Sequence, residues 1–435
     1  MKISGFENII SIEKFEYNAN IDAHEYCDFS CYVKEENIDS LVTLVDSDIL
    51  FEDDDFKFRG HIIEISYSKD ISGCSIEVKS IGSTYLFDLD KKNRIFQNEE
   101  KTLSDILSFM ESMSEVKVEG DFDPVFVDVI YQDNETDWKF MCRLCKSIGV
   151  HIFVGNNVFI GKYGTNTSKK IEEKDCIDYK LSATLLGTCV YCQLKNTLLL
   201  GDKVDMFGKN LVVIEKRYVL ENEKYYYRYI LKEISEEIMN KEKNDVYIDA
   251  IVIDNNDPEK RGRLQVSFEL EGVQDCMKDS PLWIERLHSY ASKGLGTVFI
   301  PNVGDKVCIH ICNGKAYVIG SVREEAYAEP YQDSNNKYLL LSDKVYVEYK
   351  EGVISLFNKG NKIEVSEENI IFSVGDKSTV VSEKDKVCVV IDKSVVEISS
   401  EVKVKADKTI IETKSEASIT GNSVNIKGKS GVSLN

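Results

Sequence analysis

Residues 257–320 read DPEKRGRLQVSFELEGVQDCMKDSPLWIERLHSYASKGLGTVFIPNVGDKVCIHICNGKAYVIG, and this stretch decides the fold. Apolar and polar residues alternate from Leu264 to Phe268, which is the pattern of a half-buried strand. The same alternation returns at residues 283–286, 296–300, 307–311 and 317–319. Proline, Gly-Asp and Asn-Gly separate these runs and are typical of tight turns. Five short strands with tight turns predict a small closed barrel of the OB type.

The order of these residues resembles the barrel of VgrG spike proteins of type VI secretion, and of related spikes in contractile phage tails, tailocins and extracellular injection systems. The matching residues are Asp257, Pro258, Gly262, Arg263, Trp283, Ile284, Gly294, Gly296, Phe299, Ile300, Pro301, Val303, Gly304, Asp305, Val307 and 318–322. We define the OB-fold signature as Asp257, Pro258, Gly262, Arg263, Pro301, Gly304 and Asp305. Because that family uses the barrel as architecture, the resemblance implies turns and core at these positions rather than an active site.

The first half of the chain predicts a β-rich domain with two helices. Strand-like composition covers residues 3–17, 28–33, 56–66 and 75–80. The first helix follows Thr102, which can form a capping box with Asp105. The second helix covers residues 138–148 and ends at Gly149, with Asn134 and Asp137 as its expected caps.

Three segments of this half resemble the VgrG hub: FRGHI at 58–62, RIFQ at 94–97 followed by DIL at 105–107, and YQDNETDWKFMCRLCKSIGVHIFV at 131–154. The sequence departs from the family at Asn134-Glu135-Thr136, which stand near the usual Glu-Ser pair, at Trp138, which precedes Phe140, and at Cys145-Lys146, which stand near the family's Glu. These departures keep the helix-then-strand pattern. They would matter if the acidic residue served a partner contact. The resemblance implies a hub that docks the inner tube.

From residue 338 onward the composition changes, since no proline follows Pro330 and Val, Ile, Ser, Lys and Glu dominate. Apolar residues recur eight apart, at Val345/Val353, Ile363/Ile371, Val387/Val395, Val402/Ile410, Val424/Val432 and Ile426/Leu434. A fixed period of alternating apolar and polar residues predicts a β-solenoid. The units are too short to enclose a core, so we expect a homotrimer with a triple-stranded intertwined β-helix. A flat amyloid-like sheet or a single-chain solenoid is the alternative.

The expected fold is therefore mainly β, with an α+β hub that contains a β-barrel, an OB-fold barrel and a β-helix needle. The expected domains are 1–240 for the hub, 246–325 for the barrel and 338–435 for the needle. The charged stretch 232–245, which could form a short helix, is expected to link hub and barrel. The connection at 323–337 is too short for the lysozyme domain that some phage relatives carry there.

Composition excludes several classes of function. The chain has 435 residues, of which 43% are apolar and 30% are charged, as in a globular chain of two to four domains. Its formal net charge of −21 argues against nucleic acid and anionic lipid as partners. The aromatic run KYYYRYIL at 224–231 is therefore expected to be a sheet face and no base-stacking platform. The densest acidic run, 46–55, is expected to be a solvated loop.

No apolar run is long enough to span a bilayer, and the N-terminus lacks a signal h-region, so we expect synthesis in the cytoplasm. The twelve cysteines are then expected to be reduced. Two pairs have CxxC spacing, Cys142/Cys145 in a helical pattern and Cys189/Cys192 in a strand pattern. These patterns favour packing over zinc binding.

Known catalytic motifs such as GxSxG, HExxH, the P-loop and the dinucleotide fingerprint do not occur, and the five histidines are scattered without ligand-pair spacing. We therefore expect no catalytic residue, cofactor or metal site, and no enzyme. A spike-associated peptidoglycan hydrolase or effector carrier and a receptor-binding tail fibre are the alternatives. The hub signature argues against the fibre.

Pattern and resemblance together imply the homotrimeric hub and membrane-puncturing spike of a contractile injection apparatus. By resemblance, the hub meets the inner tube protein and baseplate wedge proteins. The sequence ends within the repeat, at Val432, Ser433, Leu434 and Asn435, and these residues are expected to bind a PAAR-type tip protein with effector cargo. An iron-binding HxH apex is not expected, because no histidine follows His310. The assembled spike would leave the cytoplasm on contraction and puncture a target membrane.

Overall fold

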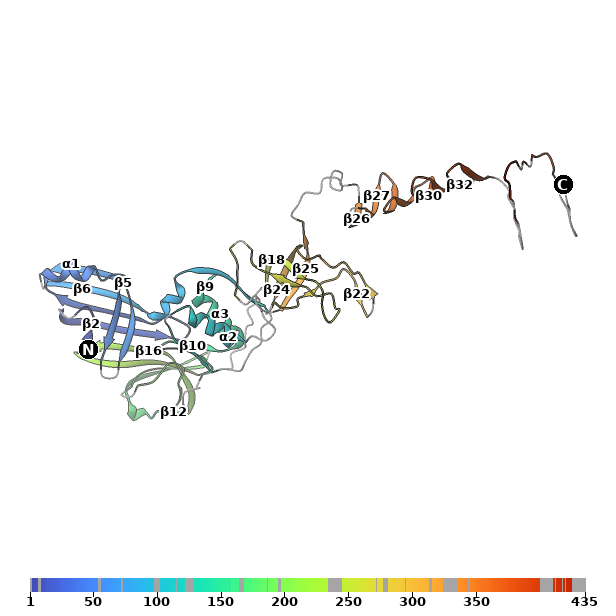
Figure 1. Ribbon diagram of the computed structural model, residues 1–435. Coiled ribbons are helices and arrows are strands. Elements are labelled where there is room, and N and C mark those ends of the chain that lie inside the picture. The colour runs from blue at the N-terminus through green and yellow to red at the C-terminus, as the bar shows by residue number, and fades with distance from the viewer. Residues whose placement is uncertain are drawn as a thin grey trace. The chain divides into compact units, whose positions relative to one another are not determined.

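The computed structural model describes all of the chain except residues 1, 7–8, 54–55, 72, 98–101, 115, 122–128, 156, 164–167, 186, 195–196, 234–244, 271, 277–280, 294, 313–314, 324–334, 336, 343, 400–409, 411, 417, 419 and 425–435. The chain divides into two compact units, Met1–Glu324 and Glu325–Asn435 (Figure 1). Strands predominate in both units, so the prediction of a mainly β fold is confirmed. In the described part of the chain, no helix is long and apolar enough to cross a bilayer.

A twelve-stranded sheet forms the largest part of the first unit. Its early strands are β1 (Lys2–Ile3), β2 (Ile9–Asn20), β3 (Tyr26–Val33), β4 (Asp48–Glu52), β5 (Lys57–Asp70) and β6 (Gly73–Gly82). Its later strands are β12 (Ser168–Lys170), β13 (Cys176–Thr184), β14 (Gly187–Leu194), β15 (Lys203–Met206), β16 (Lys209–Glu221) and β17 (Lys224–Glu233). The two groups join where β2 pairs antiparallel with β16, so segments about two hundred residues apart complete one sheet.

The core of this sheet is rich in aromatic rings. Phe29 packs edge to face against Phe6 and Phe51, with ring centroids 5.2 and 5.4 Å apart. The KYYYRYIL run lies in β17, where Tyr227 and Tyr229 are buried in the same core. The prediction that this run is a sheet face is therefore confirmed.

The acidic run 46–55 differs from its prediction, because its central residues form β4 and not a loop. Ile49 and Phe51 are buried, while Asp48 and Glu52 on the alternate positions are exposed. The acidic residues therefore occupy the solvent face of a strand, which period-two alternation allows even in a strongly charged segment. A short helix, α1 (Ile38–Val42), precedes this strand.

A second layer with two helices lies between the two groups of sheet strands in the sequence. It contains α2 (Leu103–Ser112), α3 (Asp137–Ile148), β7 (Lys91–Gln97), β8 (Val118–Asp121), β9 (Val129–Thr136), β10 (His151–Phe153) and β11 (Val158–Gly161). Short 3-10 turns cover Glu35–Asn37, Ser83–Asp88 and Glu173–Asp175. α2 and α3 pack on their own apolar core together with β7, β9, β10 and β11.

The helix caps confirm one sequence prediction and correct another. The predicted capping box of Thr102 and Asp105 is present at the start of α2, where the Thr102 amide donates to Asp105 Oδ2 at 2.7 Å. Gly149 ends α3 with a φ of 71°, a left-handed conformation that glycine favours. At its start, however, the cap is Thr136, whose hydroxyl accepts from the Lys139 amide at 3.3 Å. The predicted capping by Asn134 and Asp137 was wrong.

The barrel consists of a five-stranded sheet in the order β19 (Gln265–Ser267), β18 (Asp245–Asp254), β24 (Lys306–Cys312), β25 (Lys315–Val322) and β21 (Glu285–Arg286). Two short strands of the barrel region lie outside it and form a hairpin, β22 (Ala291–Ser292) with β23 (Leu295–Gly296). The predicted strand at 296–300 is therefore wrong. The longest barrel strand, β18, precedes the stretch on which the prediction was based and was missed.

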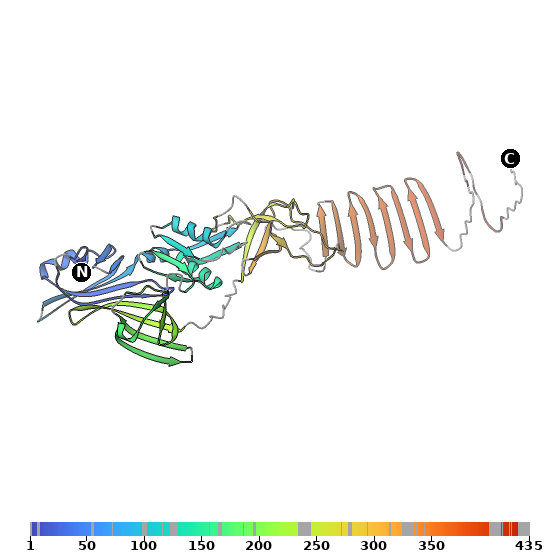
Figure 2. The same ribbon diagram turned by 90° about the horizontal axis from the view of Figure 1, so that it is seen from below.

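The second unit contains one antiparallel sheet of eight strands, the needle sheet. Its strands are β26 (Lys337–Ser342), β27 (Val345–Lys350), β28 (Val353–Asn358), β29 (Asn361–Val365), β30 (Asn369–Val374), β31 (Ser378–Glu383), β32 (Lys386–Ile391) and β33 (Ser394–Ser399). Each strand pairs with the next, as the ladder in Figure 2 shows. Strand starts are eight residues apart except for nine between β30 and β31, which confirms the predicted period over 337–399. The predicted pairs Val402/Ile410, Val424/Val432 and Ile426/Leu434 each include a residue outside the described part of the chain.

Candidate functional site

The first part of the OB-fold signature forms a turn around one buried carboxylate. The side chain of Asp257, which is 6% exposed, accepts hydrogen bonds from the backbone amides of Glu259, Arg261 and Arg263 at 3.0, 2.8 and 3.2 Å. The Arg263 guanidinium adds a bond of 2.8 Å. These donors, above all the Arg263 side chain, hold the pKa of Asp257 well below its usual range. Both oxygens are thus occupied in closing the turn.

The residues beside this carboxylate serve the same turn. Pro258 follows Asp257 and fixes the backbone at the start of the turn. Gly262 has a φ of 78°, in the left-handed region where a side chain would strain the backbone. The Asp257–Arg263 arrangement has the geometry of a structural clamp.

The second part of the signature ties another turn to the barrel. The Asn302 amide donates to Asp305 Oδ2 at 2.8 Å, which closes the turn that begins at Pro301. Gly304, with a φ of 93°, donates its amide to the Val252 carbonyl of β18 at 2.9 Å. The Val252 amide in turn donates to the Asp305 carbonyl at 3.0 Å. This turn therefore extends the ladder of the central barrel strand.

A group of apolar side chains between the two halves of the signature is exposed. Leu295, Val298, Phe299, Ile300 and Val303 are 68, 72, 55, 39 and 59% exposed. The sequence predicted that part of this run would form a core strand. In the structure these side chains are instead exposed, and exposed apolar side chains that cluster can mark a protein interface.

The RIFQ segment, residues 94–97 in β7, connects the hub to the barrel, a role that the sequence did not reveal. Ile95 belongs to the apolar core of the barrel, whereas Phe96 belongs to the core around α2 and α3. Gln97 Nε2 donates to Asp275 Oδ2 at 2.6 Å, and the Cys276 amide donates to the Ile95 carbonyl at 2.9 Å. Asp275 lies in β20 (Gln274–Asp275), which pairs parallel with β7. Successive residues of β7 thus point alternately into two different cores.

The first residue of this segment stabilises the helical layer. Arg94 is 4% exposed and its Nη1 donates to Asp137 Oδ1 at 2.9 Å. Asp137 also accepts from Gln132 Nε2 at 2.9 Å and pairs with Lys92. Removing one partner of such a buried pair leaves an uncompensated charge, so the network fixes how β7, β9 and α3 meet.

One of the departures from the hub signature, at Asn134-Glu135-Thr136, has a structural explanation. Glu135 stands near the position of the usual Glu-Ser pair, and its Oε2 accepts from Arg143 Nη2 at 2.6 Å. Arg143 Nη2 also donates to the Tyr131 carbonyl at 2.8 Å. This acidic residue therefore ties β9 to α3 within the chain.

The two CxxC pairs lie in packing positions, as expected. None of the twelve cysteines, all of which lie in the described part of the chain, forms a disulfide. Burial raises the pKa of Cys142 to about 12 and that of Cys192 to about 12, which disfavours the thiolate that binds metals. Cys145 is 1% exposed in the core beside α3. Cys189 and Cys192, three apart in β14, point to opposite faces.

The needle sheet carries an unbroken apolar column on one face. Following the cross-strand pairs from β26 to β33, each partner is apolar: Leu339, Val347, Leu356, Ile363, Phe372, Val380, Val389 and Val396. We call these eight residues the apolar column. On the same face a second series of cross-strand partners is mostly apolar: Tyr349, Ile354, Val365, Ile370, Ser382, Val387 and Ile398. The opposite face is mixed: Ser355 pairs with Glu364, whereas Ile371 pairs with Val381 and Tyr346 stacks on Phe357.

Much of the apolar column is exposed. Leu356, Phe372 and Val396 are 45, 46 and 57% exposed. An open sheet with such a face lacks a core of its own and gains stability when a second layer covers it. The predicted tip-binding residues Val432, Ser433, Leu434 and Asn435 lie outside the described residues.

Comparison with known proteins identifies the barrel. Residues 248–322 match the type VI secretion system/phage-baseplate injector OB domain. No curated protein sequence matches the chain.

Two solved structures share the wider fold. The E. coli c3393 protein, a component of the type VI secretion system with structural similarity to the T4 bacteriophage tail proteins gp27 and gp5, aligns with a TM-score of 0.55 and 14% identity. That alignment covers 74% of this chain and 99% of the c3393 protein. A chain of the lidded Francisella PdpA–VgrG complex aligns with a TM-score of 0.50 and 11% identity, over 90% of this chain and 76% of the other.

At 11–14% identity the solved structures establish the fold alone. The match of residues 248–322 to the injector OB domain indicates, in addition, the kind of assembly in which such a barrel occurs. The predicted resemblance to VgrG-like spike proteins is confirmed. These findings support a structural spike component of the type VI secretion or phage-tail kind.

Proposed function

We propose that this chain forms the trimeric hub and membrane-puncturing spike of a contractile injection apparatus. The single observation that carries the proposal is the apolar column, which runs through all eight strands of the needle sheet with much of its surface exposed. Three copies around a common axis would bring three such faces together and bury them. A dry core with a continuous hydrogen-bonded ladder would then resist bending during sheath contraction.

The choice of three copies rests on the period and the fold. The strands of the needle sheet repeat every eight residues, and the predicted triple-stranded β-helix places apolar side chains of all three chains on the axis. The opposite face, which carries both polar and apolar side chains, would then form the outer wall of the needle. The exposed apolar group of the barrel, 295–303, offers a further surface for contact between copies.

In this function the hub at 1–240 would dock the inner tube and meet baseplate wedge proteins. The barrel at 246–325 would join it to the needle at 338–435. We further propose that Val432, Ser433, Leu434 and Asn435 bind a PAAR-type tip protein that carries effector cargo. These partners rest on the resemblance to VgrG-like spikes. The complex would assemble in the cytoplasm and enter the target on contraction.

In this proposal the protein has a mechanical role and catalyses no reaction. The signature carboxylates support this view, since Asp257 is occupied by backbone and guanidinium donors. A peptidoglycan hydrolase needs an acid and a base that are free to meet a substrate. No observation on the described residues favours the hydrolase or the tail fibre.

The test is the solution mass of the full chain, measured by light scattering, against that of a chain cut before Tyr331. We expect three times the chain mass for the full protein, resistant to cold SDS, and weakened or lost association after the cut. The first unit keeps its own cores, so the shorter chain should remain folded. A full chain that stays monomeric at all concentrations would overturn the proposal.

A further inference from the structure

Three metal-ligating side chains lie together at one end of the barrel, outside the signature turns. Asp245 begins β18 and Cys312 ends β24, and the two residues are direct partners in the antiparallel pairing of these strands. His310 lies two residues before Cys312, so its side chain projects from the same face of β24. The ladder thus places a carboxylate, an imidazole and a thiol on one surface.

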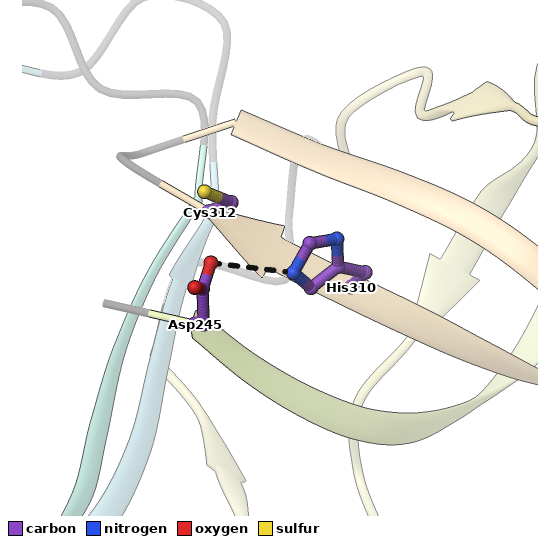
Figure 3. Close-up of side chains that lie close together, drawn as sticks. All are labelled: Asp245, His310 and Cys312. Atoms are coloured by element: carbon purple, nitrogen blue, oxygen red, sulfur yellow. Dashed lines mark ion pairs between the residues drawn. The ribbon is translucent and has the colours of Figure 1, made fainter. Parts of the chain in front are cut away.

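The potential ligand atoms are close to one another. A carboxylate oxygen of Asp245, a ring nitrogen of His310 and Sγ of Cys312 all lie within 4.8 Å of one another. Asp245 Oδ1 is 3.4 Å from His310 Nε2, and Figure 3 shows the Asp245 side chain directed toward that ring. Among the residues that the structure describes, no second group of three such side chains is this close.

The histidine is oriented but incompletely satisfied. Tyr247, its partner on β18, stacks on the ring with centroids 4.6 Å apart and planes 12° apart. His310 Nε2 is buried and makes no hydrogen bond of acceptable geometry with any described residue, although it faces Asp245. A buried polar atom without a hydrogen bond costs free energy, and a metal ion would satisfy this nitrogen.

We propose that Asp245, His310 and Cys312 bind a divalent transition metal of the zinc class, with water as the fourth ligand. Imidazole and thiolate are ligands that zinc prefers, and a carboxylate completes a three-residue set. Thiolate argues against calcium and magnesium, which take oxygen ligands.

Only a small adjustment is needed for coordination. Ligand atoms around tetrahedral zinc are about 3.5 Å apart, so the observed group must close by about 1 Å. Asp245 is exposed and Cys312 is only partly buried, so both side chains can rotate about their Cα–Cβ bonds while the strands stay paired.

The surrounding charges are compatible with this site. Lys315 lies opposite Cys312 on β25 and is exposed. The flexible stem of Lys315 lets its charge turn to solvent, so the ammonium group need not oppose a bound cation. The next lysine on this face, Lys306, pairs with Asp249 at 3.1 Å.

A bound metal would fasten the first strand of the barrel to the end of β24. This metal site goes beyond the proposed spike function, because it concerns how β18, the first strand of the barrel, is fixed to the end of β24. Since the ligands come from two strands, metal binding would add to the stability of the folded unit.

The test uses the full chain, freed of metal with a chelator and kept reduced, to which one equivalent of Co²⁺ is added. We expect intense visible bands of four-coordinate cobalt, a thiolate-to-cobalt charge-transfer band, and displacement by Zn²⁺. Cys312→Ser should remove the charge-transfer band, and His310→Gln should weaken cobalt binding by about tenfold or more. Cys308→Ser is the matched control, because Cys308 lies on the same face of β24 but outside the group.

A second measurement avoids substitution. The unaltered chain is treated with iodoacetamide with and without Zn²⁺, and alkylation of each cysteine is measured by peptide mass spectrometry. We expect Zn²⁺ to protect Cys312 and to leave the alkylation of Cys308 unchanged. The proposal is overturned if Cys312 reacts at the same rate in both samples, or if the charge-transfer band survives Cys312→Ser.

Discussion

The barrel and the needle sheet are both built mainly of short antiparallel strands, yet apolar side chains are buried in the barrel and largely exposed in the needle sheet. In the barrel, Val266 and Val318 are 0% exposed. In the needle sheet, Phe372 and Val396 are 46 and 57% exposed. Both regions alternate apolar and polar residues, so the difference arises from closure: the barrel curls around its own core, whereas the needle sheet is open.

This difference indicates which parts of the protein can bury their apolar side chains within one chain. The stability of the barrel should depend on contacts within the chain and be independent of protein concentration. The needle sheet should gain stability by mass action when copies assemble, because its apolar face has no cover within its own unit's described residues. Substitutions can therefore separate the two regions.

The largest effect is expected from a charge in the apolar column. Phe372→Asp would place a carboxylate among apolar side chains on the proposed axis, so we expect loss of the trimer, measured by light scattering. Ser373→Asp is the matched control, since Ser373 lies on the opposite face of the same strand and pairs with Lys362. Equal loss of association in both variants would contradict the assignment of the buried face.

In the barrel, Asp257→Ala should lower the thermal unfolding midpoint by several degrees without changing the oligomeric state. The substitution removes the acceptor of three backbone amides and of the Arg263 guanidinium. Glu259→Ala, which removes the exposed partner of Arg263, should have little effect. Calorimetry of both variants gives the comparison.

The low pKa of Asp257 adds a pH dependence with a definite sign. A carboxyl group with a lowered pKa in the folded state stabilises at pH values above its usual range and loses this contribution as the pH falls through its folded pKa. The protein should therefore lose stability below about pH 4, and Asp257→Ala should lose less. Equal acid sensitivity of both proteins would contradict this role of the carboxylate.

The hub provides a test of stability that depends on one chain alone. Burial raises the pKa of Glu25 to about 7, although Tyr17 donates a hydrogen bond of 2.7 Å to it. Because the pKa is raised, the contribution of Glu25 to stability is present at low pH and is lost as the pH rises toward 7. The loss is up to about 3 kcal/mol between about pH 4.5 and 7.

Glu25→Gln should abolish this slope in urea unfolding curves measured across that pH range. Gln keeps the shape of the side chain, which fits closely: a Cβ at Gly82 would lie 2.4 Å from Glu25 Cγ. The pH dependence should be the same at low and high protein concentration. A slope that persists in the variant would assign the titration to another group.

The smallest effect concerns the connection between hub and barrel. A double-mutant cycle of Gln97→Ala and Asp275→Ala should give a coupling free energy of about 1–2 kcal/mol, because the two side chains share a buried hydrogen bond to a charged group. The cycle of Arg228→Ala and Glu221→Ala, an exposed pair at 2.6 Å, should give less. Coupling that is no larger in the buried pair would contradict the proposed connection.

The sequence predicted elements better than it predicted contacts. The period of the needle strands, the capping of α2 and the sheet face of β17 follow from patterns within a few residues, and they are confirmed. The strand β4 was missed because its charges concealed the alternation of Ile49 and Phe51. Residues 296–300 alternate like a strand but lie outside the barrel sheet, since the pattern does not say which segments close the barrel.

The candidate metal ligands show the same limit. CxxC spacing, the usual local signal of a metal site, occurs at Cys142/Cys145 and Cys189/Cys192, which pack in the hub. The sequence does contain one signal, His310-Ile311-Cys312, which places two ligands on one face of a strand. The third ligand, Asp245, comes from another strand and could be found only through its pairing.

The sequence by itself determined the turns of the barrel and the repeat of the needle. The Asp257 carboxylate binds amides two to six residues away, and strand alternation is a property of consecutive residues, so both are local. Only the tertiary structure decided that alternate RIFQ residues enter two cores, that β2 meets β16, and that Asp245 faces His310. Those contacts join distant segments, and their formation depends on packing, which no local pattern encodes.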